Sequence, residues 1–424
     1  MIVSLYPLRN TWQELVKRPA QNNAILADIT RPIMEEIRTG GDRALKKFTL
    51  EYDKADVKNI QVPEQEISAA LNAIRPALLD AIMLAAANIT TFHKAQLQPP
   101  EKIQTMPGVV CWRKNVGIER VGLYIPGGTA PLFSTVLMLA IPAIIAGCRE
   151  IIICTPPGKD GNIHPTILAT AAYLGIKTIY RAGGVQAIAA MAFGTETIPR
   201  VSKIFGPGNQ YVMAAKQLVQ QEGVAIDMPA GPSEVAVYAD STGNPAFIAA
   251  DLLSQAEHGA DSQVVFVTDH EPLIVGVQKE LAAQLELLPR KALAAGALEN
   301  SKIILVNNSS EAMDLLNEYA PEHLILACAD ALQLSEKVIN AGSVFIGHYS
   351  PESAGDYASG TNHTLPTNGY AHAYSGVSVD SFIRKITFQE ISREGLLGIG
   401  SAVQIMAGAE GLDAHAEAVR VRLK

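Results

Sequence analysis

The spacing of apolar residues divides the chain into two parts, with a boundary near residue 100. Before it, apolar residues recur every three or four positions through Ile25–Ile37 and Ile67–Phe92, which predicts helices over the first hundred residues. Beyond it, up to about residue 350, short β-branched runs alternate with alanine-rich segments of helical character. The runs expected to be strands are Val121–Ile125, Ile151–Cys154, Thr178–Tyr180, Lys203–Phe205, Val264–Thr268, Ile303–Val306, Leu324–Ala327 and Val344–Ile346. This alternation predicts an α/β fold with parallel sheets flanked by helices.

Two stretches rich in glycine and proline interrupt the alternation, at Tyr124–Pro131 (YIPGGTAP) and Asp227–Ser233 (DMPAGPS). The roughly 110 residues between them match the size of a small α/β domain inserted within another. A chain of 424 residues is also too long for one ordinary core. We therefore expect at least two domains, followed from about residue 380 by a short, charged section that forms a helix or an arm.

Composition narrows the choice of partner and compartment. Lys and Arg total 34 against 42 Asp and Glu, a net charge of −8 without a basic block, so neither nucleic acid nor a membrane is an expected partner. The longest apolar stretch, Val136–Gly147, is twelve residues long and contains Pro142, which makes it too short to span a bilayer. The N-terminus lacks the features of a signal peptide and the four cysteines form no CxxC pair. We therefore expect a cytoplasmic protein with reduced thiols.

Two glycine-rich turns, Val121–Thr129 and Phe205–Asn209, each follow an expected strand and precede an expected helix. Glycines at such turns let backbone N–H groups approach a phosphate at the N-terminus of a helix. Neither turn has the GxGxxG spacing of a dinucleotide fingerprint. Taken alone, each fits an ordinary strand-to-helix turn better than a cofactor site.

The segment Asp251–Gly259 (DLLSQAEHG) has the spacing of a polar helix face. At 3.6 residues per turn, Asp251, Gln255 and His258 share one face, and Gly259 suits the C′ position of the helix. A carboxylate, an amide and an imidazole together suit a metal or a polar substrate, although glutamine is an uncommon zinc ligand. A solvated face with a capping histidine is an equally good interpretation.

Glu322 and His323 stand just before the apolar run Leu324–Ala327. Adjacent residues cannot share a strand face, but at the mouth of a strand both reach into a crevice, where open α/β sheets bind ligands. A histidine is the natural general base at neutral pH, and a neighbouring carboxylate activates water. A simple surface turn is the alternative.

Two further segments offer side chains that bind metals or substrates. Pro351–Pro366 (PESAGDYASGTNHTLP) is long, polar and irregular, as ligand-binding loops often are, and it contains Asp356 and His363. Glu410–His415 (EGLDAH), by itself, marks the start of a terminal helix. Together, these separated acidic and histidine residues are suited to form a mononuclear metal site with a base beside it.

Several long motifs in the expected order resemble those of the histidinol dehydrogenase family. Ile226–Val235 (IDMPAGPSEV) and Ala249–His258 (AADLLSQAEH) resemble the signature of that family. The similarity extends over essentially the whole chain through YIPGG, FGPGN, APEHL, PESAGDYASGTNHTLP and AEGLDAH. Chance agreement among motifs of this length is negligible.

This resemblance implies a role for each matching position. The zinc ligands of the family match Gln255, His258, Asp356 and His415, and its catalytic pair matches Glu322 and His323. Its substrate contacts match Ser233, His363 and Glu410, in addition to the four zinc ligands and His323. Its NAD contacts match Tyr124, Gln186 and Asn209. Asp251 is then no longer expected to be a ligand, whereas His415 gains a function.

The resemblance also implies two incomplete Rossmann-like domains with small helical N- and C-terminal parts, in an intertwined homodimer. The expected parts are a helical arm at 1–20, a larger domain at 21–123 and 235–377, an inserted NAD-contacting domain at 124–234, and a C-terminal arm at 378–424. The larger domain is expected to carry most zinc and catalytic residues. The C-terminal arm is expected to supply one zinc ligand to the site of the partner subunit.

The implied activity is the four-electron oxidation of L-histidinol through L-histidinaldehyde to L-histidine, the last steps of histidine biosynthesis, with NAD and one zinc ion per subunit. In the family, zinc holds the imidazole and amino groups of the substrate, a role of positioning. The resemblance assigns removal of the hydroxyl proton to His323 and activation of the water that adds to the aldehyde to Glu322. The loop of the family often reads DYCSG where this chain has DYASG at Asp356–Gly360, which speaks against a cysteine hemithioacetal.

Three alternatives remain open at the level of sequence. A relative of the same fold would oxidise another polyol, such as a sulfonated propanediol, but Ser233, His363 and Glu410 together favour histidinol. A binding module without activity needs no base, so Glu322 and His323 argue against it. A zinc hydrolase needs no NAD, so the residues that match NAD contacts argue against that activity.

Overall fold

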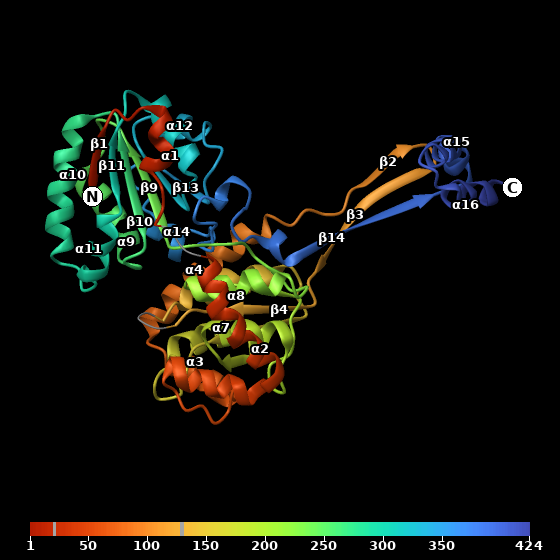
Figure 1. Ribbon diagram of the computed structural model, residues 1–424, viewed down its shortest axis with the longest axis horizontal. Helices are drawn as coiled ribbons and strands as arrows, with labels where there is room; N and C mark the ends of the chain where they lie inside the picture. Colours follow the sequence, from red (N-terminus) through yellow and green to blue (C-terminus); the bar gives the residue numbers. More distant parts are fainter. Residues whose placement is uncertain (20–22, 128–130) are drawn as a thin grey trace.

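The computed structural model describes residues 1–19, 23–127 and 131–424. Two lobes, each built on a parallel β-sheet, lie next to each other, and a long arm projects away from both and carries the C-terminus (Figure 1). Residues 128–130, which belong to the turn YIPGGTAP, lie outside the described residues. The expectation of an α/β fold with two parallel sheets flanked by helices is confirmed.

The first lobe contains a six-stranded parallel sheet in the order β1-β11-β10-β9-β12-β13. Its strands are β1 (Ile2–Leu5), β9 (Glu234–Ala239), β10 (Gln263–Thr268), β11 (Lys302–Leu305), β12 (His323–Ala327) and β13 (Ser343–Ile346). Strand β9 is buried along its whole length because its alternate side chains serve both faces of the sheet. Val235 and Val237 pack with α9 (Pro245–Ala256), α10 (Glu271–Leu285) and α11 (Lys291–Glu299). Ala236 and Tyr238 pack with α1 (Trp12–Leu15), α12 (Ser309–Tyr319) and α13 (Ala331–Ser335).

The second lobe contains a five-stranded parallel sheet in the order β6-β5-β4-β7-β8. Its strands are β4 (Arg120–Tyr124), β5 (Glu150–Thr155), β6 (Ile179–Arg181), β7 (Lys203–Phe205) and β8 (Ala225–Ile226). One face packs on α2 (Asn23–Phe48), α7 (Gly184–Phe193) and α8 (Gln210–Gln220). The other face packs on α3 (Glu64–Ala73), α5 (Phe133–Ile145) and α6 (Pro165–Tyr173), and α4 (Pro76–Lys94) covers α5.

The arm is an antiparallel sheet in the order β14-β3-β2 that ends in two helices packed against each other (Figure 1). Its elements are β2 (Lys102–Met106), β3 (Val109–Gly117), β14 (Ile383–Ile391), α15 (Arg393–Ala409) and α16 (Asp413–Leu423). Most side chains of β14 are exposed, including the apolar Ile386, Phe388 and Ile391. Exposed apolar residues gathered on one element often mark a surface that binds another protein.

The expected strands between residues 121 and 346 are all present, with small shifts at their ends. Strand β9 and the arm sheet were not expected, nor were the short strands β1 and β8. Strand β9 was missed because it directly follows the glycine- and proline-rich stretch Asp227–Ser233, which suggested a boundary. The arm sheet was missed because β2 and β3 mix polar and apolar residues and pair with β14, which lies far away in the sequence.

The N-terminal residues differ from the helical arm expected at 1–20. Ile2–Leu5 form strand β1, which pairs with β11 from Ile2↔Lys302 to Leu5↔Leu305, and within 1–19 only short helices follow. The grouping of 21–123 with 235–377 also differs from the packing. Ile33, Ile37 and Leu45 of α2 join the core formed by α7 and α8, so the second lobe begins at α2 rather than near residue 124.

Among the described residues, no single helix combines the length and the hydropathy needed to cross a membrane. Only α3 and α4 meet that test as a pair, and they are bent by 107° at the break between them.

Candidate active site

A cavity of about 320 Å³ lies between the two lobes, and we call it the inter-lobe cavity. The second lobe contributes the turn after β7 (Gly206–Gln210), and the first lobe contributes the residues that lead into β9 and β12. Eight of the side chains singled out from the sequence line this one cavity: Asn209, Ser233, Gln255, His258, Glu322, His323, Asp356 and His363. They come from separate segments between residues 209 and 363, so the fold is what brings them together.

The cavity lies at the amino edge of the six-stranded sheet. His323 is the first residue of β12 and is in register with Val235 of β9 and Ser343 of β13, which both lie at the starts of their strands. The sequence placed Glu322 and His323 at a ligand-binding mouth by analogy with the carboxyl ends of open α/β sheets. That analogy fails for this sheet, because the second lobe covers its amino edge and closes the cavity there.

The backbone of Glu234 orients both Glu322 and His323. Its N–H donates to Oε2 of Glu322 at 2.9 Å, and its carbonyl oxygen lies 3.0 Å from Nδ1 of His323. When Nδ1 carries the proton and donates it to this carbonyl, Nε2 is left as a proton acceptor. The carboxylate of Glu322 lies 3.7 Å from Nδ1 of the same ring. This arrangement suits a general base with a second carboxylate beside it.

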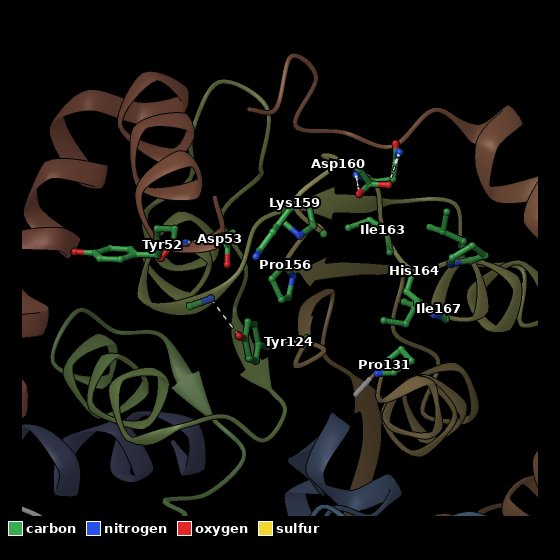
Figure 2. Close-up of a pocket in the computed structure, with 18 of the residues that line it drawn as sticks. Tyr52, Asp53, Tyr124, Pro131, Pro156, Lys159, Asp160, Ile163, His164 and Ile167 are labelled. Carbon is green, nitrogen blue, oxygen red and sulfur yellow. Dashed lines mark hydrogen bonds between the residues drawn. The ribbon is translucent and has the colours of Figure 1, made fainter. Parts of the chain in front are cut away.

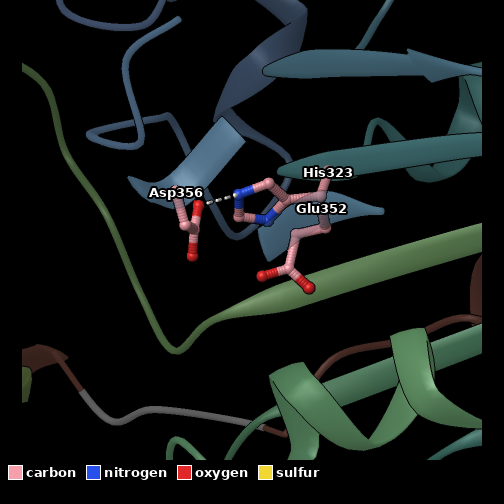
Figure 3. Close-up of side chains that lie close together, drawn as sticks. All are labelled: His323, Glu352 and Asp356. Atoms are coloured by element: carbon pink, nitrogen blue, oxygen red, sulfur yellow. Dashed lines mark ion pairs between the residues drawn. The ribbon is translucent and has the colours of Figure 1, made fainter. Parts of the chain in front are cut away.

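Four buried polar atoms around the cavity have no hydrogen-bond partner among the described residues: Oε1 of Gln255, Nε2 of His323, Oδ1 of Asp356 and Oγ1 of Thr364. Nε2 of His323 and Oδ1 of Asp356 lie 3.4 Å apart, but their geometry is not that of a hydrogen bond. Figure 3 shows the carboxylate of Asp356 facing the imidazole of His323, with Glu352 close to the same ring. Buried acceptors without partners are rare in proteins, and a metal ion is one group that satisfies them.

The helix α14 (Glu352–Tyr357) places two carboxylates next to His323. Glu352 and Asp356 are four residues apart and therefore share a helix face. With His323 they offer three ligand atoms that all lie within 4.8 Å of one another. The segment Pro351–Pro366 was expected to be irregular, so its short helix and the contribution of Glu352 were missed. The spacing E-x-x-x-D was the signal that could have revealed them.

Gln255 and His258 reach the cavity from the end of α9. The helix ends at Ala256 with Glu257 as its C-cap, so His258 occupies the C′ position that the sequence assigned to Gly259. That assignment was wrong because the helix ends earlier than expected. Asp251, one turn before Gln255, does not line the cavity.

The charges around the cavity influence one another strongly. Burial raises the pKa of Glu322 to about 8, although the charge of His323 acts in the opposite direction. Burial acts to lower the pKa of His323, but the carboxylates of Glu322 and Asp356 outweigh it and raise that pKa to about 10. Burial acts to raise the pKa of Asp356, but His323 outweighs it and lowers that pKa to about 2. In the polypeptide alone, the charge of Asp356 is thus balanced by His323, while burial favours the protonated form of Glu322.

His258 and His363 are held in the neutral form that binds metals and substrates. Loss of water contacts lowers the pKa of both, including His258, whose side chain is nevertheless exposed at the cavity wall. Nδ1 of His363 lies 2.9 Å from the backbone oxygen of Asp356, and its Nε2 lies 3.2 Å from Oγ1 of Thr135 on α5. His363 therefore joins the two lobes at the cavity.

A second cavity, of about 1270 Å³, lies at the carboxyl edge of the five-stranded sheet, and we call it the second-lobe cavity. Tyr124, Gln186 and Asn209 line it, as do Asp53 and Lys159. Figure 2 shows Asp53 and Tyr124 on one side of it and Ile163 and Ile167 on the other. A cavity with both apolar and polar walls at this edge of a parallel sheet is typical of a nucleotide site.

Hydrogen bonds fix the polar groups of the second-lobe cavity. The hydroxyl of Tyr124 accepts from the N–H of Gly184 at 3.1 Å, and Nε2 of Gln186 donates to Oδ2 of Asp53 at 3.2 Å. Asn209 caps α8 by accepting from the N–H groups of Tyr211 and Val212, which confirms the expected turn before a helix. Asn209 also lines the inter-lobe cavity, so the two cavities meet at this residue.

Glu410, the C-cap of α15, and His415, in α16, lie at the tip of the arm, far from both cavities (Figure 1). Both side chains are exposed and neither lines the inter-lobe or the second-lobe cavity. Within one chain, the structure therefore does not bring these two residues to the other candidate ligands. The sequence did not single out several residues at or next to the sites: Asp53, Thr135, Lys159, Glu234, Glu352 and Arg18, which binds the side chain of Glu234.

The full length of the chain is similar to known histidinol dehydrogenases. The family model described as "Histidinol dehydrogenase" matches residues 16–423. A histidinol dehydrogenase from Bacteroides thetaiotaomicron is 60% identical over 418 residues, which cover 99% of this chain and 98% of the relative. One from Xylella fastidiosa is 52% identical over 96% of this chain and 95% of the relative. The crystal structure of histidinol dehydrogenase from Elizabethkingia anophelis superposes with a TM-score of 0.97 at 54% identity, covering 100% of this chain and 98% of that one.

Proposed function

This chain belongs to the histidinol dehydrogenase family, and we propose from its two cavities how it oxidises histidinol with zinc and NAD. The reaction is the oxidation of histidinol in histidine biosynthesis. A same-fold enzyme for another polyol, a binding module and a zinc hydrolase are not favoured, because the chain matches histidinol dehydrogenases along its entire length at 50–60% identity.

The single observation that supports a zinc site best is the pair of unpartnered buried oxygens, Oε1 of Gln255 and Oδ1 of Asp356, in one cavity. With His258 they form a donor set of amide, carboxylate and imidazole, and oxygen and nitrogen ligands of this kind suit Zn²⁺. We assign these three residues as the ligands from this chain. When bound, zinc positions the amino alcohol and offsets the negative charge at Asp356, which lowers the pKa of His323.

His323 is the general base in this proposal. Its Nε2 takes the proton of the substrate hydroxyl as a hydride leaves the same carbon for NAD, and an aldehyde results. A water molecule then adds to the aldehyde: the carboxylate of Glu322 takes one proton of this water, and the protonated His323 returns its proton to the former carbonyl oxygen, so that a gem-diol forms and His323 is again free to act as a base. His323 removes the second hydroxyl proton as another hydride leaves for a second NAD, which yields the carboxylate of histidine. Ser233 and His363 line the same cavity and are assigned to hold the substrate.

NAD is assigned to the second-lobe cavity, with Tyr124, Gln186 and Asn209 as contacts. Asn209 belongs to both cavities, so a dinucleotide in the larger one is able to present its reactive ring to a substrate in the smaller one. The position of the cavity at the carboxyl edge of the five-stranded sheet also supports this assignment, because open α/β sheets bind nucleotides there.

The remaining zinc ligand, His415, and the substrate contact Glu410 are assigned to the site of a partner subunit. Two features of the arm support this assignment. It holds His415 away from the cavities of its own chain, and its strand β14 exposes Ile386, Phe388 and Ile391 to solvent. A homodimer in which each arm lies on the other subunit covers this apolar surface and completes both sites.

The proposed function is tested by following NADH absorbance with L-histidinol as substrate. We expect the purified wild-type protein to form NADH. The rate of NADH formation should be lower by about 10²-fold or more in His323→Asn, which lacks the base. The matched comparison is the same assay with a sulfonated propanediol in place of histidinol. NADH formation with that polyol and none with histidinol would overturn the substrate assignment.

A further inference from the structure

The side chain of Glu234 is a buried carboxylate that one arginine neutralises. It is 2% exposed, and Arg18 binds it with two parallel hydrogen bonds, from Nε to Oε1 at 2.5 Å and from Nη2 to Oε2 at 2.8 Å. The guanidinium carbon of Arg18 lies 4.1 Å from the centre of the ring of Tyr319, a stacking contact available to arginine. Arg18 comes from the segment that follows α1, far from Glu234 in the sequence.

The backbone of the same Glu234 contacts the two residues assigned to catalysis. Its N–H donates to Oε2 of Glu322 at 2.9 Å, and its carbonyl oxygen lies 3.0 Å from Nδ1 of His323. The conformation of the two peptide groups that flank Cα of Glu234 therefore sets where the carboxylate and the imidazole point. The side chain that Arg18 holds belongs to the residue whose backbone N–H and carbonyl oxygen hold the catalytic pair.

Arg18 also holds the chain that leads into Glu322. Its Nη2 donates to the carbonyl oxygens of Tyr319 at 2.8 Å and Ala320 at 3.3 Å. Ala320 ends α12 in the left-handed conformation, with φ of 50°, only two residues before Glu322. One guanidinium group thus ties the start of β9 to the turn that delivers Glu322 and His323 into β12.

We propose that Arg18 is a positioning residue that fixes the orientation of Glu322 and His323 through Glu234. The proposal rests on the proposed function, which assigns those two residues to catalysis. Arg18 does not line the inter-lobe cavity and is not offered as a contact of substrate or cofactor. A lysine would keep the charge but lacks the planar fork that makes two parallel bonds to a carboxylate, so it would replace Arg18 only in part.

Steady-state kinetics of Arg18→Ala and Arg18→Lys test the proposal, with zinc content measured on the same samples. We expect kcat to fall by roughly 10- to 100-fold in Arg18→Ala, because small errors in the position of reacting groups have effects of that size. Arg18→Lys should lie between Arg18→Ala and wild type. KM for NAD and zinc content should stay near wild type, since Arg18 touches neither site. An unchanged kcat, or an effect confined to KM for NAD, would overturn the proposal.

Two further variants separate positioning from stability. Arg18→Ala leaves the carboxylate of Glu234 buried without its partner, so Arg18→Met combined with Glu234→Gln removes both charges and keeps the backbone contacts. We expect this double variant to fold, by thermal denaturation, and still to lose kcat. A folded double variant with the wild-type kcat would overturn the proposal. Arg120→Gln is the matched control, because Arg120 pairs with Glu150 at 2.5 Å but lines neither cavity, and its kcat should be unchanged.

A double-mutant cycle shows whether Arg18 acts through His323. Adding Arg18→Ala to His323→Asn should reduce kcat by much less than Arg18→Ala does in wild type, because the group that Arg18 orients is already gone. If the fold loss of kcat in the combined variant equalled the product of the two single losses, the proposal would be overturned. Wild-type rates in both Glu322→Gln and His323→Asn would instead refute the catalytic pair. A wild-type rate in Arg18→Ala, with both of those variants impaired, would refute the positioning role alone.

Discussion

Nε2 of His323 and Oδ1 of Asp356 lie 3.4 Å apart in a buried cavity, and neither atom has a hydrogen-bond partner among the described residues. Oε1 of Gln255 lines the same cavity and is equally unpartnered. Burying polar atoms without partners costs about 1–3 kcal/mol each, so folds retain such atoms where a ligand satisfies them. The end of α9 and the end of α14 therefore offer polar atoms that a bound cation would satisfy, in line with the proposed zinc site.

Removal of zinc should abolish activity, and adding zinc or a similar divalent ion should restore it. Zinc should also raise the melting temperature of the metal-free protein, because an ion that binds only the folded state stabilises it. Gln255→Ala should remove most of that rise by deleting one ligand. Calorimetry measures the melting temperatures, and elemental analysis measures the zinc content of the same samples.

Asp251→Asn is the control for the zinc experiment. Asp251 lies one turn before Gln255 on α9 but does not line the cavity, so this variant should bind zinc as the wild type does. Full activity in a preparation shown to contain no metal would rule out a zinc site with a role in the reaction.

Two NADH should form for each histidinol consumed, with little free aldehyde. The cavity provides both His323 as a base and Glu322 to activate water, and it encloses only about 320 Å³, which favours retention of the aldehyde between the two steps. Absorbance gives the NADH, and a carbonyl-trapping reagent gives the aldehyde. One NADH per histidinol with accumulation of aldehyde would identify the protein as a simple alcohol dehydrogenase.

The sequence predicted strands well where a short continuous segment carries the whole apolar pattern. The β-branched runs of the two parallel sheets were found because buried strands have a continuous apolar pattern. Arg18 and Glu234 were missed because their contact joins residues more than two hundred positions apart, and nothing in either local segment marks it. The position of Glu322 and His323 at the amino edge was missed for a similar reason, since it depends on how the second lobe covers the first.

His415 should complete the zinc site of the neighbouring subunit. Co-expressed His415→Ala and His258→Ala chains, each inactive alone, should regain activity, because a mixed dimer has one intact site. The arm that carries His415 projects away from the cavities of its own chain, which is the basis of this expectation. NADH formation by the purified mixture measures it.

Co-expression of His258→Ala with Gln255→Ala is the matched control. Both residues reach the cavity from the same helix, α9, so no mixed dimer has an intact site and no activity should return. If the His415→Ala and His258→Ala mixture were as inactive as this control, the shared site would be refuted.

Asp53→Asn should stabilise the protein at alkaline pH and have no effect in acid. Burial raises the pKa of Asp53 from 3.8 to about 6, so its charged form is less stable in the folded chain than in the unfolded chain. The folded state therefore holds the proton more tightly, and stability falls as the pH rises from about 4 to 6. Above pH 6 the variant, which avoids this charge, should gain roughly 1–2 kcal/mol, allowing for partial exposure.

Chemical denaturation at pH 8 and pH 4 measures the effect of Asp53→Asn. The amide keeps an oxygen that accepts from Nε2 of Gln186, so the local contact is preserved while the charge is lost. A variant less stable than wild type at pH 8 would show that the charge of Asp53 is favourable in the second-lobe cavity, contrary to this expectation.

Substitutions of Glu322 and of His323 should slow different halves of the reaction. Glu322→Gln should slow oxidation of the aldehyde far more than oxidation of the alcohol, since only the second half needs an added water. His323→Asn should slow both halves, because each removes a hydroxyl proton as a hydride leaves. Each affected step should slow by roughly 10²–10⁴-fold, as is typical for a positioned acid or base. Single-turnover assays that start from histidinol or from histidinal separate the two halves.

The zinc content of these two variants shows whether His323 acts as a general base or as a zinc ligand. His323, Glu352 and Asp356 are close enough together to hold an ion, so the geometry alone permits His323 as a ligand. The contact of its Nδ1 with the carbonyl oxygen of Glu234 leaves one ring nitrogen, and we assign that nitrogen to the substrate proton. His323→Asn should therefore retain zinc and lose activity. Loss of zinc in this variant would make His323 a ligand, and equal slowing of both halves in Glu322→Gln would make Glu322 a residue that orients His323.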